Sequence, residues 1–478
     1  MITANEKTLK EIAYAEGLDP QYKETTLRLV ETWAKHSSTN KLRDVYYNSD
    51  NPTKDLGVSV SPDIAKKLKP HIDWAAKCVN WWADHVQFER FTADDEQAQQ
   101  QLEHICRLND INNLVRKVVQ SSLCHSVAFL TVTKGNEQWG EPSVVISGYP
   151  ATAASAVYSN AKKRITAGLV VADSTYDKAS RTHVPSLLYM FDDECTTVLT
   201  RSGKKWAAQT NAHNMGRVPM EHLSYHATLE RPFGSSRISR TVMSLVDDAQ
   251  RELMNMAACA AFSAAPQKFL LGTDPETGKK MSKTKFENYI GSLLMVTKNT
   301  ADQIPQFGQL AQLQMQPHSD YIRTLAGLFS DATGVPLSSL GFSSTNPTSA
   351  DAILANQEDA IIDISNYIEA CKHSLVTTAT MAIGQAQNIS YIDARNIYDI
   401  SAIFANPSTP SPVSMSDAVQ KRVASFPWMA YSDVVLRDLG YKGAELKQLQ
   451  QDRKKQQGAR LIEASLQASA KKETEDGA

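Results

Sequence analysis

A run of regularly spaced apolar residues between positions 238 and 260 most constrains how this chain folds. The apolar positions recur every three or four residues: Ile238, Val242, Leu245, Ala249, Leu253, Met256 and Ala260. This spacing predicts one face of an α-helix of about seven turns, which is long for a globular protein. The helix is expected to end at Ala265-Pro266, because proline has no backbone N–H to continue the hydrogen-bond ladder.

A second helix is expected to return over residues 317–333, with Gly334 as its C-terminal cap and Val335-Pro336 as its stop. Between the two helices, residues 266–315 read as irregular, with short strands near 269–272 and 293–296 around a turn. After the second helix, the segment GFSSTNPTS (341–349) is a polar loop. Thr348 then opens a third long helix, with Asp351 three residues on as a short-armed capping box.

The flanking regions differ in character. Residues 1–125 read as mainly helical, including a helix from about Ile64 to Trp82 that starts after Ser61-Pro62. Residues 126–226 are β-rich, with short strands separated by polar turns. The strands are expected at 127–132, 143–147, 169–173, 187–191 and 196–200. Residues from about 386 to the end form a helical tail, with a proline-rich linker at 406–413.

Composition limits the possible functions. The chain has 478 residues, of which 42% are hydrophobic, so a sizeable core is available. Its formal net charge is −2, whereas proteins that grip phosphates tightly carry a basic excess. The six cysteines are scattered without a C-x-x-C pair, which predicts reduced thiols and no zinc ribbon. No apolar stretch is long enough for a bilayer, so we expect a soluble chain without a targeting segment.

Motifs for catalysis are missing from the sequence. The nearest match to a phosphate-binding loop, Gly272 to Lys280, has glycines one residue too far apart and Lys280 in place of Ser/Thr. H-E-x-x-H and G-x-S-x-G do not occur. The adjacent carboxylates Asp94-Asp95, Asp192-Asp193 and Asp247-Asp248 diverge and are expected on solvated faces. These observations predict no enzyme activity, no cofactor and no metal.

The order of these elements resembles the portal proteins of long-tailed (siphovirus-type) bacteriophages. The resemblance rests on three segments: RPFGSSRISRTVMSL (231–245) followed by 265–272, GVPLSSLG (334–341), and the early run from Leu56 to Phe91. It covers roughly residues 20 to 465. Each motif is loose, and the order of the elements is the stronger signal.

The resemblance implies an α+β fold: a mostly helical portal with a β-rich wing lobe, a two-helix stem, a small α/β clip and a helical crown. The wing would be residues 1–230, with the β-rich lobe at about 126–226. The outgoing stem helix would be 231–265, the clip 266–315 and the returning stem helix 316–334. Residues 335–385 would hold the tunnel loop and the following long helix, and 386–478 the crown.

The resemblance also implies a site. The tunnel loop would be Phe342, Ser343, Ser344, Thr345, Asn346, Pro347 and Thr348, which offers neutral hydrogen-bonding groups and no cation. Such a loop suits a channel in which DNA must slide, because each neutralised phosphate adds affinity. Seven basic residues are candidates for phosphate or partner contacts: Arg237, Arg240, Arg251, Lys279, Lys280, Lys283 and Lys285. Solvated surface or subunit contacts remain the alternative for them, and the clip lysines can instead meet an acidic partner.

In that reading, the chain forms a ring, a homododecamer, at one capsid vertex, through which double-stranded DNA is packaged and later ejected. The implied partners are the large terminase, the head-tail adaptor, and the major capsid and scaffolding proteins, with no membrane. The implied location is the virion, and the host cytoplasm during assembly. Two alternatives stay open: another structural virion protein of capsid or tail, and a DNA-processing enzyme such as a nuclease or the packaging ATPase.

Overall fold

The computed structural model describes residues 11–54, 68–178, 181–203, 205–264, 268–271, 306–309, 314–342, 357–408, 412–441, 445–446, 448–456 and 458–459. The chain divides into two compact units, residues 1–407 and 408–478. The division falls later than the boundary near 386 expected from the sequence. The reason is that β12 (Ile400–Phe404) pairs antiparallel with β1 (Phe88–Ala93), so this stretch belongs to the first unit.

The N-terminal part of the first unit is mainly helical. It contains η1 (Pro20–Tyr22), α2 (Lys23–Tyr47), α4 (Trp74–His85), α5 (Glu96–Leu108) and α6 (Ile111–His125). In the described part of the stretch from Ile64 to Trp82, residues 68–73 are not helical and the helix runs from Trp74. Pro70 explains the difference, because proline disfavours helical geometry in the residue before it and donates no hydrogen bond. Residues 55–67 lie outside the described part.

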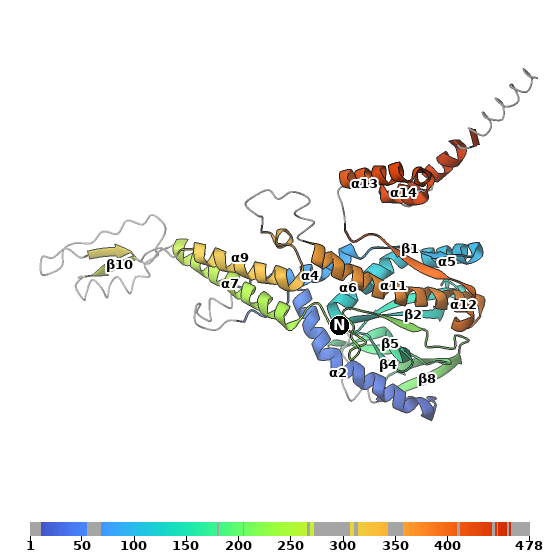
Figure 1. Ribbon diagram of the computed structural model, residues 1–478. Helices are drawn as coiled ribbons and strands as arrows, with labels where there is room; N and C mark the ends of the chain where they lie inside the picture. Colours follow the sequence, from blue (N-terminus) through green and yellow to red (C-terminus); the bar gives the residue numbers. More distant parts are fainter. Residues whose placement is uncertain are drawn as a thin grey trace, which may run out of the picture. The chain divides into compact units, whose positions relative to one another are not determined.

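The β-rich region forms two sheets (Figure 1). A three-stranded sheet has the order β3-β2-β9, and a five-stranded meander runs β4-β5-β6-β7-β8. Their bounds are β2 Val127–Lys134, β3 Val144–Pro150, β4 Ala154–Ser159, β5 Arg164–Asp177, β6 Thr182–Phe191, β7 Cys195–Ser202, β8 Lys205–Ala212 and β9 Met220–Ser224. The five strands expected from the sequence are confirmed as β2, β3 and parts of β5, β6 and β7, whereas β4, β8 and β9 were not foreseen.

Strand β2 is buried on both faces, which explains its nearly continuous apolar run VAFLTV. Ala128, Leu130 and Val132 face the main core, which includes α6 and α11 (Glu358–Gln387). Val127 and Phe129 face the opposite way, toward residues of the five-stranded sheet such as Phe191. Helix α2 covers that larger sheet from another side, through Leu29, Val30 and Trp33 among others.

Two long helices lie side by side in Figure 1: α7 (Arg240–Ala264) and α9 (Gln316–Thr333). They run antiparallel, since Thr333 at the end of α9 contacts Arg237 just before α7 while His318 near the start of α9 contacts Glu252. Both helices agree with the sequence-based expectation. Gly334 caps α9 in the left-handed region at φ 67°.

Short elements complete the described chain. In the part of the sequence between α7 and α9, strands β10 (Lys268–Leu271) and β11 (Gln306–Gln309) pair antiparallel. The strand expected at 293–296 lies outside the described residues. After α9 come η3 (Leu337–Leu340) and, beyond α11, α12 (Tyr391–Ile397). The second unit holds α13 (Pro412–Ser425), η4 (Pro427–Tyr431) and α14 (Asp433–Asp438). Within the described residues, none of the helices combines the length and apolar character needed to cross a bilayer.

Candidate functional site

The segment that leads into the expected tunnel loop fixes the first residue of that loop, Phe342. Val335 is buried, η3 follows, and Gly341 takes φ 91°, a left-handed conformation that glycine adopts without strain. Phe342 is half-buried and packs against the main core, with its N–H donating to Leu337 O at 3.1 Å. The rest of the expected loop, Ser343 to Thr348, and the capping box at Thr348 lie outside the described residues. Helix α11 is described from Glu358 onward.

A buried arginine joins the two long helices at the end nearest this segment. Arg237 is 8% exposed. Its Nε donates to Cys78 O at 2.8 Å, one terminal nitrogen donates to Tyr225 Oη at 3.0 Å, and the other donates to Thr333 O. The guanidinium also stacks over the indole of Trp82. We call these five residues the Arg237 joint; they connect α4, the end of β9, the start of α7 and the end of α9.

The local sequence explains why Arg237 lies there. Gly234 has φ 66°, and a Cβ at this position would stand 2.0 Å from Tyr225 O, so only glycine fits the turn. The Arg237 N–H then donates to Leu123 O at 2.9 Å. Ser239 caps α7, because its hydroxyl accepts from the Val242 N–H at 3.2 Å. The motif GSSR therefore turns the chain and directs the arginine inward before the helix begins.

The joint also reaches α11. The ring of Tyr225 lies edge-on to that of Tyr367, with centroids 5.7 Å apart, and edge-on to Trp82 at 5.5 Å. Burial raises the pKa of Tyr367 well above its usual value, and its hydroxyl is hydrogen bonded to Ser122. The helix that follows the expected loop is thus fixed to the same cluster as the helix that precedes it.

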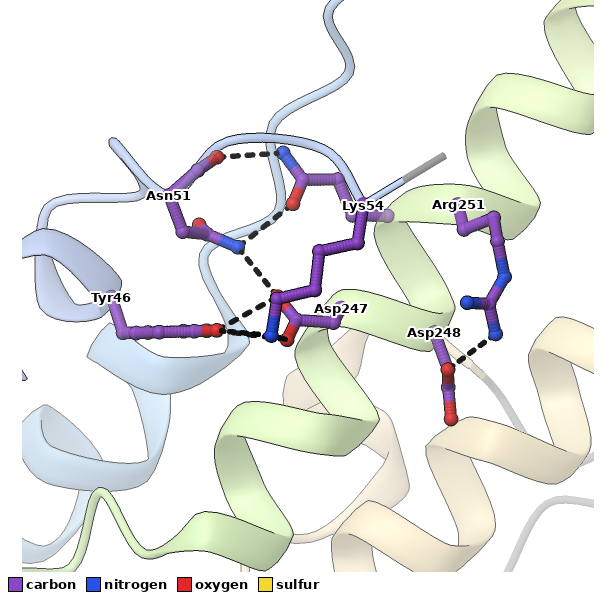
Figure 2. Close-up of polar contacts among 7 residues, drawn as sticks. Tyr46, Asn51, Lys54, Asp247, Asp248 and Arg251 are labelled. Carbon is purple, nitrogen blue, oxygen red and sulfur yellow. Dashed lines mark hydrogen bonds and ion pairs between the residues drawn. The ribbon is translucent and has the colours of Figure 1, made fainter. Parts of the chain in front are cut away.

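A second polar network fastens α7 about two turns after its first residue (Figure 2). Asp247 is buried and accepts hydrogen bonds from Tyr46 Oη at 2.8 Å, Asn51 Nδ2 at 3.1 Å and Lys54 Nζ at 2.5 Å. Gln250 extends the network by donating to Pro70 O at 2.7 Å. The expectation that Asp247 lies on a solvated face was wrong, because these donors come from residues distant in the sequence.

The predicted phosphate contacts separate into three groups. Arg237 is enclosed by its hydrogen bonds inside the protein, so it is not available to a phosphate and we withdraw it. Arg240 is exposed at the first turn of α7. Arg251 is half-buried and pairs with Asp248 (Figure 2). Lys279, Lys280, Lys283 and Lys285 lie outside the described residues.

One group of side chains among the described residues has atoms close enough to hold a metal: Asp44, Cys124 and His125, all within 4.8 Å of one another. His125 Nε2 lies 2.8 Å from Asp44 Oδ1. Burial raises the pKa of the Cys124 thiol, and Asp44 raises it further. We interpret the group as a hydrogen-bonded contact between α2 and α6.

Sequence reasoning missed the residues that organise these clusters. Trp82 and Tyr225 carry no motif, and Asp247 looks like any charged helix residue. The only usable signal was the Gly234-Ser235-Ser236-Arg237 run, which marked the helix start but not the burial of its arginine.

The chain matches a known protein family over most of its length. Residues 33–417 match the family described as "Phage portal protein, SPP1 Gp6-like". The portal protein of Mycobacterium phage L5 is 23% identical over 84% of this chain and 82% of its own length. The portal protein of Mycobacterium phage D29 is 22% identical over 84% of this chain and 83% of its own.

Solved structures give a weaker similarity. A chain from the virion of a native gene transfer agent particle aligns with TM-score 0.45 and 10% identity, covering 80% of this chain and 94% of its own. A chain from the neck of that particle aligns with TM-score 0.44 and 12% identity, covering 85% and 100%. Similarity at this level adds nothing to the sequence matches.

The family match over residues 33–417 and the two phage relatives identify a structural protein of the portal class. The chain belongs to the SPP1 Gp6-like family of phage portal proteins. This assignment agrees with the expectation of a non-enzymatic virion protein, and it sets aside the nuclease, the packaging ATPase and the capsid or tail component.

Proposed function

We propose that copies of this chain assemble into a ring, a dodecamer, at one capsid vertex, and that double-stranded DNA is packaged and ejected through it. The family match over residues 33–417 carries the proposal. In a ring, one surface of each subunit contacts a different surface of the next, and the assembly closes when the rotation closes.

Electron microscopy of the purified full-length protein tests the ring directly. We expect closed rings with a central hole wide enough for a duplex, and a native mass that is twelve times the 52.7 kDa chain. A protein that stays monomeric or dimeric, also in lysates where the capsid shell assembles, would overturn the proposal. A closed ring of another size would correct the subunit number alone.

We further propose that Phe342 to Thr348 form the tunnel loop that lines the narrowest part of the channel. The described residues support this placement through the two elements that flank the loop. Helix α9 leads to Phe342 through Gly334 and η3, and α11 is anchored by Tyr367 to the Arg237 joint that also holds the end of α9. The loop itself is neutral, so it adds no counterion-release term to its contact with DNA.

The cationic candidates are proposed as secondary contacts. Arg240 is exposed, and Arg251 needs only to leave its ion pair with Asp248 to reach a phosphate or a neighbouring subunit. Lys279, Lys280, Lys283 and Lys285 are proposed to meet DNA or an acidic surface of the packaging motor or tail adaptor. The proposed partners are the large terminase, the head-tail adaptor, and the capsid and scaffolding proteins, with assembly in the host cytoplasm.

A further inference from the structure

Helix α4 holds the end of α9 through one of its faces. Trp74, Cys78 and Trp82 recur every four residues, so they lie on the same side of α4. The ring of Trp74 packs on that of Phe329 in α9, with centroids 5.3 Å apart. The indole Nε1 of Trp82 donates to Thr333 O at 3.3 Å. This face of α4 therefore fixes the last turns of α9 before the chain continues into η3.

Lys77 carries these contacts past the end of α9. It lies next to Cys78 on α4, and its ammonium donates to Ser339 O in η3 at 2.9 Å. The two residues are 262 positions apart in the sequence, so the bond joins two elements that only the fold brings together. Asp73 Oδ1, just before α4, lies 3.9 Å from the same ammonium, and both side chains are partly exposed, so this ion pair is weak.

The bond from Lys77 falls where η3 ends. The N–H of Gly341 donates to Ser338 O, and the N–H of Phe342 donates to Leu337 O. The end of a helical turn presents carbonyl groups that need further donors, and a lysine side chain is a common donor to them. Lys77 acts in this way on Ser339 O, although it comes from another helix. The end of η3 is thus held from within and from α4.

We propose that Lys77 is a positioning residue for the proposed tunnel loop. Its bond to Ser339 O sets the point at which the chain leaves η3, and Phe342 packs against the main core directly after that point. A loop is placed only as precisely as the groups that support it. The inference rests on the proposed function and adds the residue through which α4 supports the start of the loop.

Amide hydrogen exchange in the DNA-free, full-length protein tests this role. Lys77→Met keeps the aliphatic stem and removes the donor. We expect exchange over residues 335–342 to accelerate by about threefold or more, because the end of η3 opens more often without the bond. Lys77→Arg keeps a cationic donor on a long stem and should restore most of the protection. Lys69→Met removes an exposed lysine before α4 and serves as the matched control, with exchange like that of wild type.

The same samples report whether the variant is folded. Strands β6 and β7 contribute Leu188, Met190 and Leu199 to a separate core cluster, so their exchange should not change in Lys77→Met. Acceleration of β6 and β7 to the same extent as residues 335–342 would indicate general destabilisation and overturn the inference. Exchange over residues 335–342 that equals wild type in Lys77→Met would overturn it as well.

Packaging distinguishes positioning from a contact that only stabilises the fold. We expect Lys77→Met to form procapsids in normal amounts and to lose DNA-filled heads, and Lys77→Arg to recover them. Faster exchange together with an unchanged number of filled heads would show that the bond has no role in placing the loop, and the inference would fail.

The variant Thr345→Lys/Asn346→Lys separates this inference from the loop proposal on which it rests. Impaired packaging in both Lys77→Met and the double-lysine variant supports both proposals. Normal packaging in Lys77→Met alone leaves the loop proposal standing and overturns the role of Lys77. Normal packaging in both variants contradicts the loop proposal itself, and the role of Lys77 with it.

Discussion

The guanidinium carbon of Arg237 lies 3.6 Å from the centroid of the Trp82 indole ring. This stacking places a cation between α4 and the ends of both long helices, where its nitrogens bond to the carbonyls of Cys78 and Thr333. A single planar group, the guanidinium, thus makes all of these contacts. Because the chain enters the proposed tunnel loop nine residues after Thr333, the joint sets the position from which the loop begins.

Replacing Arg237 by lysine should destabilise the first unit by about 2–4 kcal/mol, because lysine keeps the charge but loses the planar fork and the ring stacking. A fall of several degrees in the thermal midpoint would report the loss. Arg240→Lys, three residues further and exposed, should change stability by about 0.5 kcal/mol or less. Equal effects of the two substitutions would contradict the joint.

The Asp247 network makes a separate prediction. Asp247→Asn keeps the shape of the side chain but removes the charge that accepts from Tyr46 and Lys54, so we expect a loss of about 1–3 kcal/mol. Lys54→Gln should cost less, under about 1 kcal/mol, because the lysine side chain is 63% exposed and solvent screens its ion pair. Chemical unfolding of both variants checks the order, and a larger loss from Lys54→Gln would reverse our assignment of the buried partner.

Stability should depend on pH through His213. Burial lowers the pKa of this imidazole, and the nearby Asp192 offsets only part of the shift. The unfolded chain therefore binds a proton at His213 more readily than the folded chain does. The stabilising contribution is present above the unfolded pKa of about 6.5 and is lost as the pH falls toward the lower folded value. In His213→Gln, the thermal midpoint should depend less on pH between pH 7 and 5.5. An unchanged slope of the midpoint against pH would exclude this histidine as a source of the pH dependence.

Local signals in the sequence predicted the elements whose causes are local. The 238–260 periodicity indicated α7, and Gly334 marked the end of α9 through its left-handed φ. Contacts between distant residues could not be read in this way. The pairing of Phe91 with Ala402 joins two strands whose sequences share no pattern. Because of this pairing, the first unit extends to residue 407 and does not end near 386.

The burial of charged residues was equally hidden. Asp247 lies within the helical repeat and Arg237 lies in the turn before it, and their partners Tyr46 and Cys78 lie more than 150 residues earlier. Polar residues become buried only when the fold brings donors and acceptors to them. The tunnel loop and the clip lysines stay predictions, because they fall outside the described residues.

Lack of catalysis is a further expected outcome. The purified protein should neither hydrolyse ATP nor cleave DNA with Mg²⁺ present, since the Gly272 to Lys280 segment does not have the spacing of a phosphate-binding loop. A radiolabelled phosphate-release assay measures the first activity. ATP turnover that survives stringent purification and disappears in Lys279→Ala would contradict the prediction, because this lysine lies in the nearest match to the motif.

The proposed tunnel loop gives the most direct test of the channel. Replacing Thr345 and Asn346 by lysine adds two charges per subunit, and a ring multiplies them by its subunit number. Each cation that neutralises a phosphate releases counterions and strengthens the grip on DNA, so the duplex should stick and packaging should slow. Surface substitutions of this kind change stability by about 0.5 kcal/mol or less, so rings and procapsids should still form. Thr345→Ser/Asn346→Gln is the matched neutral control.

We therefore expect the lysine variant to yield procapsids in normal amounts but few DNA-filled heads, and the neutral variant to package like wild type. Counting filled and empty heads by electron microscopy measures the difference. Raising the salt concentration in an in vitro packaging reaction should partly rescue the lysine variant, because the added phosphate contacts are screened. Normal packaging by the lysine variant at low salt would place residues 342–348 outside the channel, and the proposal that α9 and α11 flank the tunnel loop would have to change with it.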